Sequence, residues 1–149
     1  MKAILLGIIM TLTSMTALAQ DNGLITKASK FGFQETQARL ETAIKDKGLT
    51  IFAKVNHGEG AAQAGLKMPP AIVTIFGSPK GGTPFMLAAP TAGIDFPLKA
   101  LVWADTAGKV HVSYNTLDYV KARHGIAGLD ELTRKLDGVL ANIAGTATE

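Results

Sequence analysis

The sequence predicts an α+β fold, a two-layer sandwich in which two long helices pack on one face of an antiparallel sheet. Three observations support this prediction. Apolar residues recur at helical spacing over residues 33–47 and again over residues 129–144. Short segments rich in β-branched residues lie between these two stretches. Two of them, residues 98–104 and 109–115, flank the turn sequence Asp105-Thr106-Ala107-Gly108, which is typical of a β-hairpin and therefore of antiparallel pairing.

The N-terminal part of the predicted sandwich alternates strand and helix. Residues 24–28 are predicted to form a short first strand. In the first long helix, Gly32 can serve as the N-cap and Glu35 lies near the positive helix end, while Gly48 is well suited to follow the last turn. Residues 49–56 then alternate between apolar and more polar side chains, which predicts a strand with one face more polar than the other.

The middle of the chain contains a loop, a buried strand and a short helix. Residues 57–70 are predicted to be a loop with at most one helical turn. Residues 71–77 form a continuous apolar run rich in β-branched residues, which indicates an interior strand. Thr83 can cap a short helix over residues 85–89, because a proline then occupies the first helical position.

The C-terminal part is predicted to be helical after the hairpin. Residues 117–124 form a short helix that Gly125 stops. The last long helix carries Asp130 and Glu131 in its first turn, where negative charge is favoured. Two long amphipathic helices cover one face of the sheet, so the other face needs cover from loops or a partner subunit.

The chain opens with a signal-peptide pattern. Lys2 gives a positive start, residues 3–10 are apolar, and Ala17-Leu18-Ala19 is a cleavage pattern that leaves Gln20 first in the mature chain. A membrane anchor is the alternative, but a span needs about 20 predominantly apolar residues, and Thr and Ser interrupt this run. We therefore expect a signal peptide over residues 1–19, a single domain over residues 20–149, a periplasmic or secreted location, and no membrane span after cleavage.

Composition excludes several classes of function. The 149 residues contain no Cys, which rules out a disulfide, a thiolate metal site and a Cys nucleophile. The formal net charge is +3, and the basic residues are scattered rather than clustered as in nucleic-acid-binding proteins. No close-spaced ligand motif such as H-E-x-x-H occurs. The sequence therefore predicts no nucleic-acid partner, no metal site and no cofactor.

Four segments, HGEGAAQAGLKMPP, IFGSPKGGTPFM, GIDFPLKALVWAD and GKVHVSYNTLDYVKARHGI, occur in this order along the chain. Together they resemble the bacterial domain of unknown function 302 family, and the resemblance extends from about residue 24 to residue 143. It implies a compact α+β unit around an antiparallel sheet. Dimers are known in the family, so the resemblance also implies a homodimer, which would cover the free sheet face. Ser78 stands where the family usually has Asn before Pro-Lys.

The stretch IFGSPKGGTPFM suggests a pocket for an anion. Lys80 supplies a positive charge, Gly81 and Gly82 would let backbone N–H groups point outward, and Thr83 begins a helix whose N-terminus attracts anions. The spacing differs from that of a phosphate-binding P-loop, because Lys80 precedes the glycines. The alternative is an ordinary strand–turn–helix corner with a helix cap, which is the commoner use of such residues.

Five further candidates lie at strand ends and loops, where binding sites usually occur. His57 follows the second strand, Asp95 precedes a later one, Tyr114 and Asn115 end the hairpin, and His124 ends the short helix. We expect these side chains to gather with the lysine of the previous stretch around one ligand-binding cleft. Each also has a structural interpretation, as a turn residue, a helix cap or a packed aromatic ring.

The preferred functional interpretation is a non-catalytic, exported binding or accessory module that holds a small anionic or polar ligand. The alternative is a hydrolase- or lyase-like enzyme that uses Asp95 with His57 or His124 as acid and base, which requires a perturbed ionisable pair in a water-poor pocket. A third interpretation is a purely structural partner protein, which would expose a large apolar patch. No Ser-His-Asp constellation is predicted, because no serine has the context of a nucleophile elbow.

Overall fold

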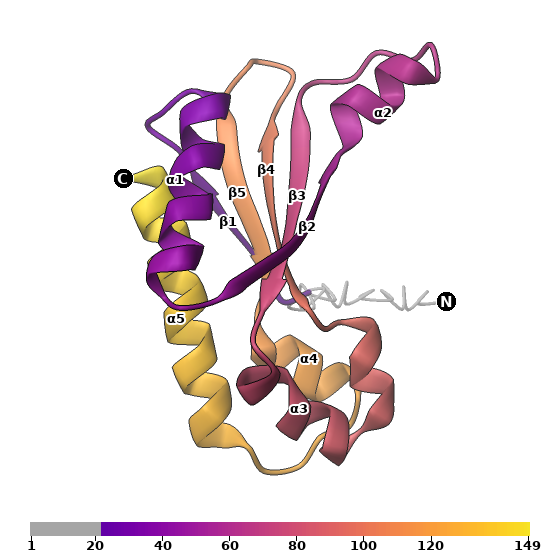
Figure 1. Ribbon diagram of the computed structural model, residues 1–149, viewed down its shortest axis with the longest axis vertical. Helices are drawn as coiled ribbons and strands as arrows, with labels where there is room; N and C mark the ends of the chain where they lie inside the picture. Colours follow the sequence, from indigo (N-terminus) through magenta and orange to yellow (C-terminus); the bar gives the residue numbers. More distant parts are fainter. Residues whose placement is uncertain (1–21) are drawn as a thin grey trace, which may run out of the picture.

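A five-stranded antiparallel sheet forms the centre of the protein (Figure 1). The computed structural model describes residues 22–149, so the predicted signal peptide and its cleavage site lie outside the described residues. The strand order is β1-β5-β4-β3-β2, and every neighbouring pair is antiparallel. The strands are β1 (Leu24–Ala28), β2 (Thr50–Asn56), β3 (Ala71–Gly77), β4 (Leu98–Ala104) and β5 (Val110–Asn115).

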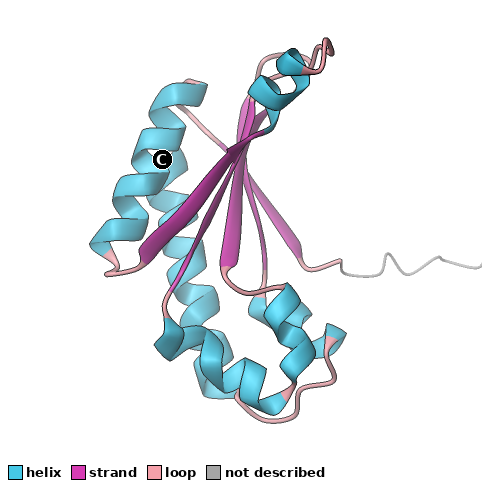
Figure 2. Ribbon diagram, turned by 45° about the vertical axis from the view of Figure 1, so that its right-hand side comes forward, coloured by secondary structure: helices cyan, strands magenta, loops and turns pink. Residues whose placement is uncertain are grey.

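The two long helices, α1 (Phe33–Asp46) and α5 (Asp130–Thr148), lie side by side on one face of the sheet (Figures 1 and 2). The predicted α+β two-layer sandwich is therefore confirmed. The shorter helices sit at the two ends of the sheet, with α2 at one end and α3 and α4 at the other. Their bounds are α2 (His57–Gln63), α3 (Pro79–Ala88), the 3-10 helix η1 (Pro90–Ile94) and α4 (Leu117–Arg123). Within residues 22–149, no helix is long and apolar enough to cross a membrane.

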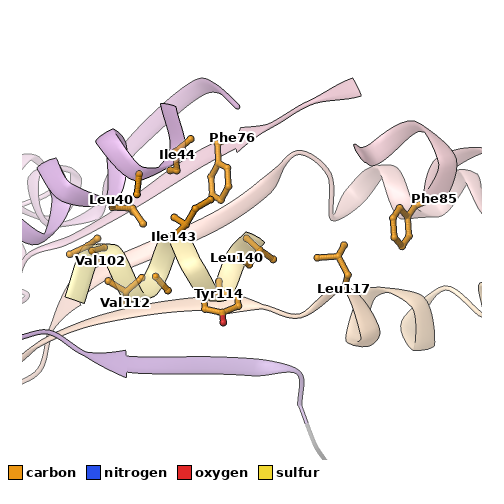
Figure 3. Close-up of a cluster of buried hydrophobic side chains, with 14 of the residues drawn as sticks. Leu40, Ile44, Phe76, Phe85, Val102, Val112, Tyr114, Leu117, Leu140 and Ile143 are labelled. Carbon is orange, nitrogen blue, oxygen red and sulfur yellow. The ribbon is translucent and has the colours of Figure 1, made fainter. Parts of the chain in front are cut away.

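The hydrophobic core lies between the sheet and the two long helices (Figure 3). Val102 and Val112 are register partners on β4 and β5, so their side chains point to the same face. Ile44 of α1 and Ile143 of α5 pack into the same cluster from the helical layer. Each such fully buried side chain contributes about 1.5–3 kcal/mol relative to an exposed one, and together they fix the helices to this face.

Three helix boundaries differ from the sequence prediction by more than one residue. α3 begins at Pro79 rather than after Thr83, because Pro79 itself occupies the first helical position and Ser78 lies at the N-cap. α2 begins at His57, directly after Asn56, whose side-chain oxygen accepts a hydrogen bond from the Glu59 N–H and so caps the helix. α5 continues to Thr148, four residues beyond the predicted end.

Candidate functional site

An apolar cleft of about 460 Å³ lies between α3, α5 and the adjoining ends of the sheet strands. Aliphatic and aromatic side chains form most of its wall, including Phe52, Met86, Phe96, Leu132, Leu136 and Val139. Among the described residues that line it, Lys80 of α3 and Lys135 of α5 are the charged ones. Within residues 22–149, neither lysine takes part in a salt bridge, so both positive charges are free to meet an anion.

The two glycines beside Lys80 shape this cleft by allowing close packing. A Cβ atom on Gly82 would lie 3.1 Å from Cδ1 of Phe96, which is tighter than ordinary contact, and one on Gly81 would lie 3.6 Å from Cδ2 of Leu136. Both glycine N–H groups donate to the Ser78 carbonyl, at 3.0 Å and 3.2 Å. The prediction that they present N–H groups outward to an anion is therefore wrong, because the helix already uses those donors.

A polar cluster, separate from the apolar cleft, joins η1 to the end of α4. The Asp95 carboxylate contacts His124 through Oδ2 and Nε2 at 2.6 Å, and its Oδ1 accepts a hydrogen bond from Arg123 at 3.1 Å. On the other side of the imidazole ring, His124 Nδ1 lies 2.9 Å from the Thr91 hydroxyl oxygen. Only 13% of the Asp95 side chain and 7% of the His124 side chain are exposed.

From the sequence, Asp95 was paired with either His57 or His124 as acid and base, but Thr91 and Arg123 were not indicated as their partners. Thr91 lies in a Pro-Thr-Ala-Gly stretch that has no recognised motif context. The sequence contains one signal for Arg123 as a member of this cluster, which is that it directly precedes His124. Within residues 22–149, no group of three or more His, Asp or Glu side chains is arranged to hold a metal ion.

A partly buried carboxylate on α5, Asp137, was also missed. Its Oδ1 accepts a hydrogen bond from the Leu117 N–H at 2.7 Å and so satisfies a donor in the first turn of α4. Burial raises the pKa of the Asp137 carboxyl above its ordinary value, although the Leu117 hydrogen bond opposes this effect. Burial and then the Asp137 charge also raise the pKa of the Tyr114 phenol. Asp137 therefore ties α5 to the first turn of α4.

The uncovered face of the sheet carries a further hydrogen-bonded row. Trp103 and His111 are register partners whose rings stack with centroids 4.6 Å apart. The Trp103 indole N–H donates to the Ser113 hydroxyl at 2.9 Å, and that oxygen lies 2.8 Å from the Thr26 hydroxyl. A hydrogen bond from His111 Nε2 at 3.1 Å lowers the pKa of Asp105. These contacts hold the Trp103 ring in a fixed orientation on this face.

The structure distributes the predicted site residues over five places. Residues 80–83 line the apolar cleft, and Asp95 with His124 forms the polar cluster. Asn115 borders a shallow depression on the uncovered sheet face, whereas the Tyr114 side chain is buried in the hydrophobic core (Figure 3). His57 begins α2, at the opposite end of the sheet from α3 (Figure 1). The expectation that these side chains gather around one cleft is wrong.

Antiparallel topology explains where that expectation failed. In an antiparallel sheet, β2 ends where β3 begins, so the residue after β2 lies at the opposite end from the residue after β3. His57 follows β2, whereas Lys80 follows β3 and Asp95 precedes β4. The C-terminal ends of neighbouring strands lie at the same edge of a sheet only when the strands are parallel.

Comparison with known proteins gives a family and a fold. The family described as domain of unknown function DUF302 matches residues 25–143. A crystal structure of an uncharacterized conserved protein DUF302 from Bacillus stearothermophilus is similar, with a TM-score of 0.76 and 18% sequence identity over 84% of this chain and 98% of that chain. At this identity the likeness concerns the fold alone.

Two curated relatives carry a functional name. Fluoride-specific ion channel FluC 1 of Brucella suis biovar 1 (strain 1330) is 37% identical over 128 residues, which are 86% of this chain and 48% of that protein. Fluoride-specific ion channel FluC 1 of Brucella abortus biovar 1 (strain 9-941) is also 37% identical, over 86% of this chain and 46% of that protein. The chain thus spans about half the length of the curated relatives it matches.

Proposed function

This chain belongs to the family of the domain of unknown function DUF302, and we propose that it is an exported binding module whose apolar cleft holds an amphipathic anion. The observation that carries the proposal is the lining of the cleft. This lining is apolar except for a few polar groups and two lysines, which form no salt bridge within residues 22–149. Its volume of about 460 Å³ lies within the usual range for small-molecule sites. Export is supported by the signal-peptide pattern.

The chemistry of the cleft changes the expected ligand from a small polar anion to one with an apolar body. Phe52, Phe96 and Leu136 offer carbon surface that water solvates poorly. A ligand chain between α3 and α5 would cover that surface, and Lys80 or Lys135 would attract its anionic group. Each buried methylene is worth about 0.8 kcal/mol, whereas an exposed ion pair is worth about 1 kcal/mol or less. The apolar body should therefore dominate affinity.

A chain-length series tests this function directly. We expect the purified protein to bind straight-chain monocarboxylates from hexanoate to dodecanoate, with affinity rising about fourfold per added methylene, which corresponds to about 0.8 kcal/mol each. Isothermal titration calorimetry measures this. Leu136→Trp should fill the cleft and abolish binding. Leu87→Trp on the exposed surface of α3 is the matched control and should bind like the wild-type protein.

Two results would count against ligand binding in the cleft. One is an affinity that does not change with chain length. The other is unchanged binding by a folded Leu136→Trp protein. Lys80→Met and Lys135→Met should each weaken carboxylate binding by a few-fold and leave the methylene increment intact, because the apolar part of the ligand contacts other residues.

We further propose that the homodimer forms through the sheet face that α1 and α5 leave uncovered. Leu101, Val73 and Trp103 lie together there and are only partly buried in one chain. Lys99 of β4 has no acidic partner within residues 22–149. If the two-fold axis runs between the two stacked sheets and perpendicular to β4, the two copies of β4 stack antiparallel. Lys99, at the start of one β4, would then approach Asp105, after the end of the other. The family resemblance also implies a dimer, which would suit this uncovered face.

Light scattering after size-exclusion chromatography tests the dimer. We expect twice the chain mass at micromolar concentration for the wild-type protein and a monomer for Leu101→Lys, because a charge would be buried in the apolar interface. Leu87→Lys, which places the same charge on a surface outside that face, should remain dimeric. A monomeric wild-type protein, or a Leu101→Lys dimer as stable as the wild type, would contradict the proposed interface.

A second candidate function is acid–base chemistry by Asp95 and His124. The specific observation in its favour is their 2.6 Å contact in a largely buried position. His57 cannot share this role in one chain, because it lies at the other end of the sheet. In the hydrolase- or lyase-like alternative, the candidate acid and base are therefore Asp95 and His124, in the cluster between η1 and α4.

A further inference from the structure

Thr91, His124 and Asp95 form a continuous chain of hydrogen bonds. The Thr91 hydroxyl oxygen lies 2.9 Å from His124 Nδ1, and His124 Nε2 lies 2.6 Å from Asp95 Oδ2. The hydroxyl belongs to an exposed residue, while the imidazole and the carboxylate are largely buried behind it. A nucleophile within reach of a base, with the base oriented by a third group, is the arrangement that activates hydroxyl nucleophiles.

The hydrogen-bonding capacity of each group fixes the direction of the chain. An ionised carboxylate only accepts hydrogen bonds, so Nε2 of His124 carries the proton that faces Asp95. In the neutral imidazole, Nδ1 then has a free lone pair, and the Thr91 O–H donates to it. Arg123 donates to the second carboxylate oxygen and so holds Asp95 in place. Thr91 is therefore aligned to give up its proton to His124.

We propose that Thr91 is the nucleophile of an acyl-transfer site, with His124 as its general base and Asp95 as the residue that positions the imidazole. This site is separate from the cleft and does not depend on ligand binding there. The substrate class is an ester or thioester with a small apolar acyl group.

The neighbouring side chain indicates the apolar acyl group. Thr91 and Ile94 are three residues apart in the 3-10 helix η1, where side chains at this spacing lie on the same side. Ile94 is 70% exposed, so its side chain is free to contact a ligand beside the Thr91 hydroxyl. An acyl chain held next to the Thr91 hydroxyl would cover it.

The reaction balances with water as the only co-reactant. The Thr91 oxygen forms a bond to the acyl carbon while its proton moves to His124 Nδ1. The tetrahedral adduct then collapses, the bond to the leaving oxygen or sulfur breaks, and the leaving group takes the proton from His124. Water attacks the Thr91 ester in the same way, which releases the acid and restores the hydroxyl.

Covalent labelling of the full chain tests the proposal. We expect p-nitrophenyl acetate and hexanoate to acylate Thr91, with the adduct located by peptide mass spectrometry. Thr91→Val should lose the adduct, Thr91→Ser should keep it, and His124→Gln and Asp95→Asn should each lower the acylation rate at least about tenfold. Ile94→Ala should lower the rate for hexanoate several-fold and leave acetate nearly unchanged.

Two outcomes would overturn the assignment. If wild type and Thr91→Val release p-nitrophenol at equal rates and no adduct is found on residue 91, the cluster only fastens η1 to α4. If Ile94→Ala affects both esters equally, the acyl chain does not contact that side chain and the substrate class is wrong. Adduct formation at Thr91 and calorimetric binding of carboxylates are separate readouts on the wild-type protein, so failure of cleft binding and failure of acyl transfer are separable.

Discussion

Phe85→Ala is expected to lower the free energy of unfolding by about 3–5 kcal/mol. The Phe85 side chain is 0% exposed and belongs to the hydrophobic core, where it lies beside Leu117 (Figure 3). Its ring centroid lies 5.4 Å from that of Phe96. Truncation would leave a cavity under α3, which the surrounding side chains could fill only in part.

The same substitution should weaken ligand binding, because Phe85 supports one wall of the cleft. Phe96 lines the cleft and rests against Phe85, and Met86 follows Phe85 on α3. Urea denaturation followed by circular dichroism measures the stability, and calorimetry measures the binding. Phe52→Ala is the matched control: Phe52 also lines the cleft but is 54% exposed, so its loss should reduce binding with little change in stability. Equal destabilisation by the two substitutions would contradict the role of Phe85.

The layer architecture was predictable because it depends on periodic patterns in contiguous residues. The first long helix was predicted over residues 33–47 and is observed as Phe33–Asp46, since its apolar stripe and Gly48 are local signals. The last helix was predicted to end near residue 144, although Ala147 and Thr148 are also buried. Small and hydroxyl side chains carry a weak apolar signal, so the last turn of α5 was missed.

The start of α3 was not predictable from local signals. Two glycines and Pro84 favour a loop followed by a late helix start, and this was the prediction. In the structure Gly81 and Gly82 are helical, and their lack of side chains allows α3 to approach Leu136 and Phe96. Tertiary packing thus overrides the local propensity of these residues.

The candidate site could be predicted residue by residue but not as an arrangement. Asp95 was paired with either His57 or His124 without a signal to choose between them, and the contact with His124 joins residues 29 positions apart in the sequence. Thr91 reaches the same histidine across 33 positions. Such long-range pairs leave no spacing signal in one sequence, whereas a helical metal motif does. Of the cleft, the sequence indicated only residues 80–83 for the same reason, because α3 and α5 contribute its walls from distant segments.

Gly23→Ala is expected to destabilise the protein by about 2–5 kcal/mol, for two reasons that add. Gly23 has φ = 70°, and an L-residue in this left-handed region costs about 1–2 kcal/mol. An added Cβ would also overlap Cβ and Cγ of Tyr119, which sit at the base of that side chain and cannot swing away. Such overpacking typically costs about 1–3 kcal/mol.

Gly48→Ala separates the cost of the left-handed backbone from the cost of the overlap, because at Gly48 only the backbone cost applies. Gly48 has φ = 68°, and an added Cβ would meet no atom within 4 Å. Chemical denaturation should therefore show a loss of about 1–2 kcal/mol for Gly48→Ala and a clearly larger one for Gly23→Ala. The Gly23 carbonyl also accepts a hydrogen bond from the Thr116 N–H at 2.9 Å. Relief of the overlap would pull this carbonyl away from the start of α4, so faster hydrogen exchange at Thr116 should accompany the loss. Equal costs for the two substitutions would mean that Gly23 and Tyr119 are not in contact.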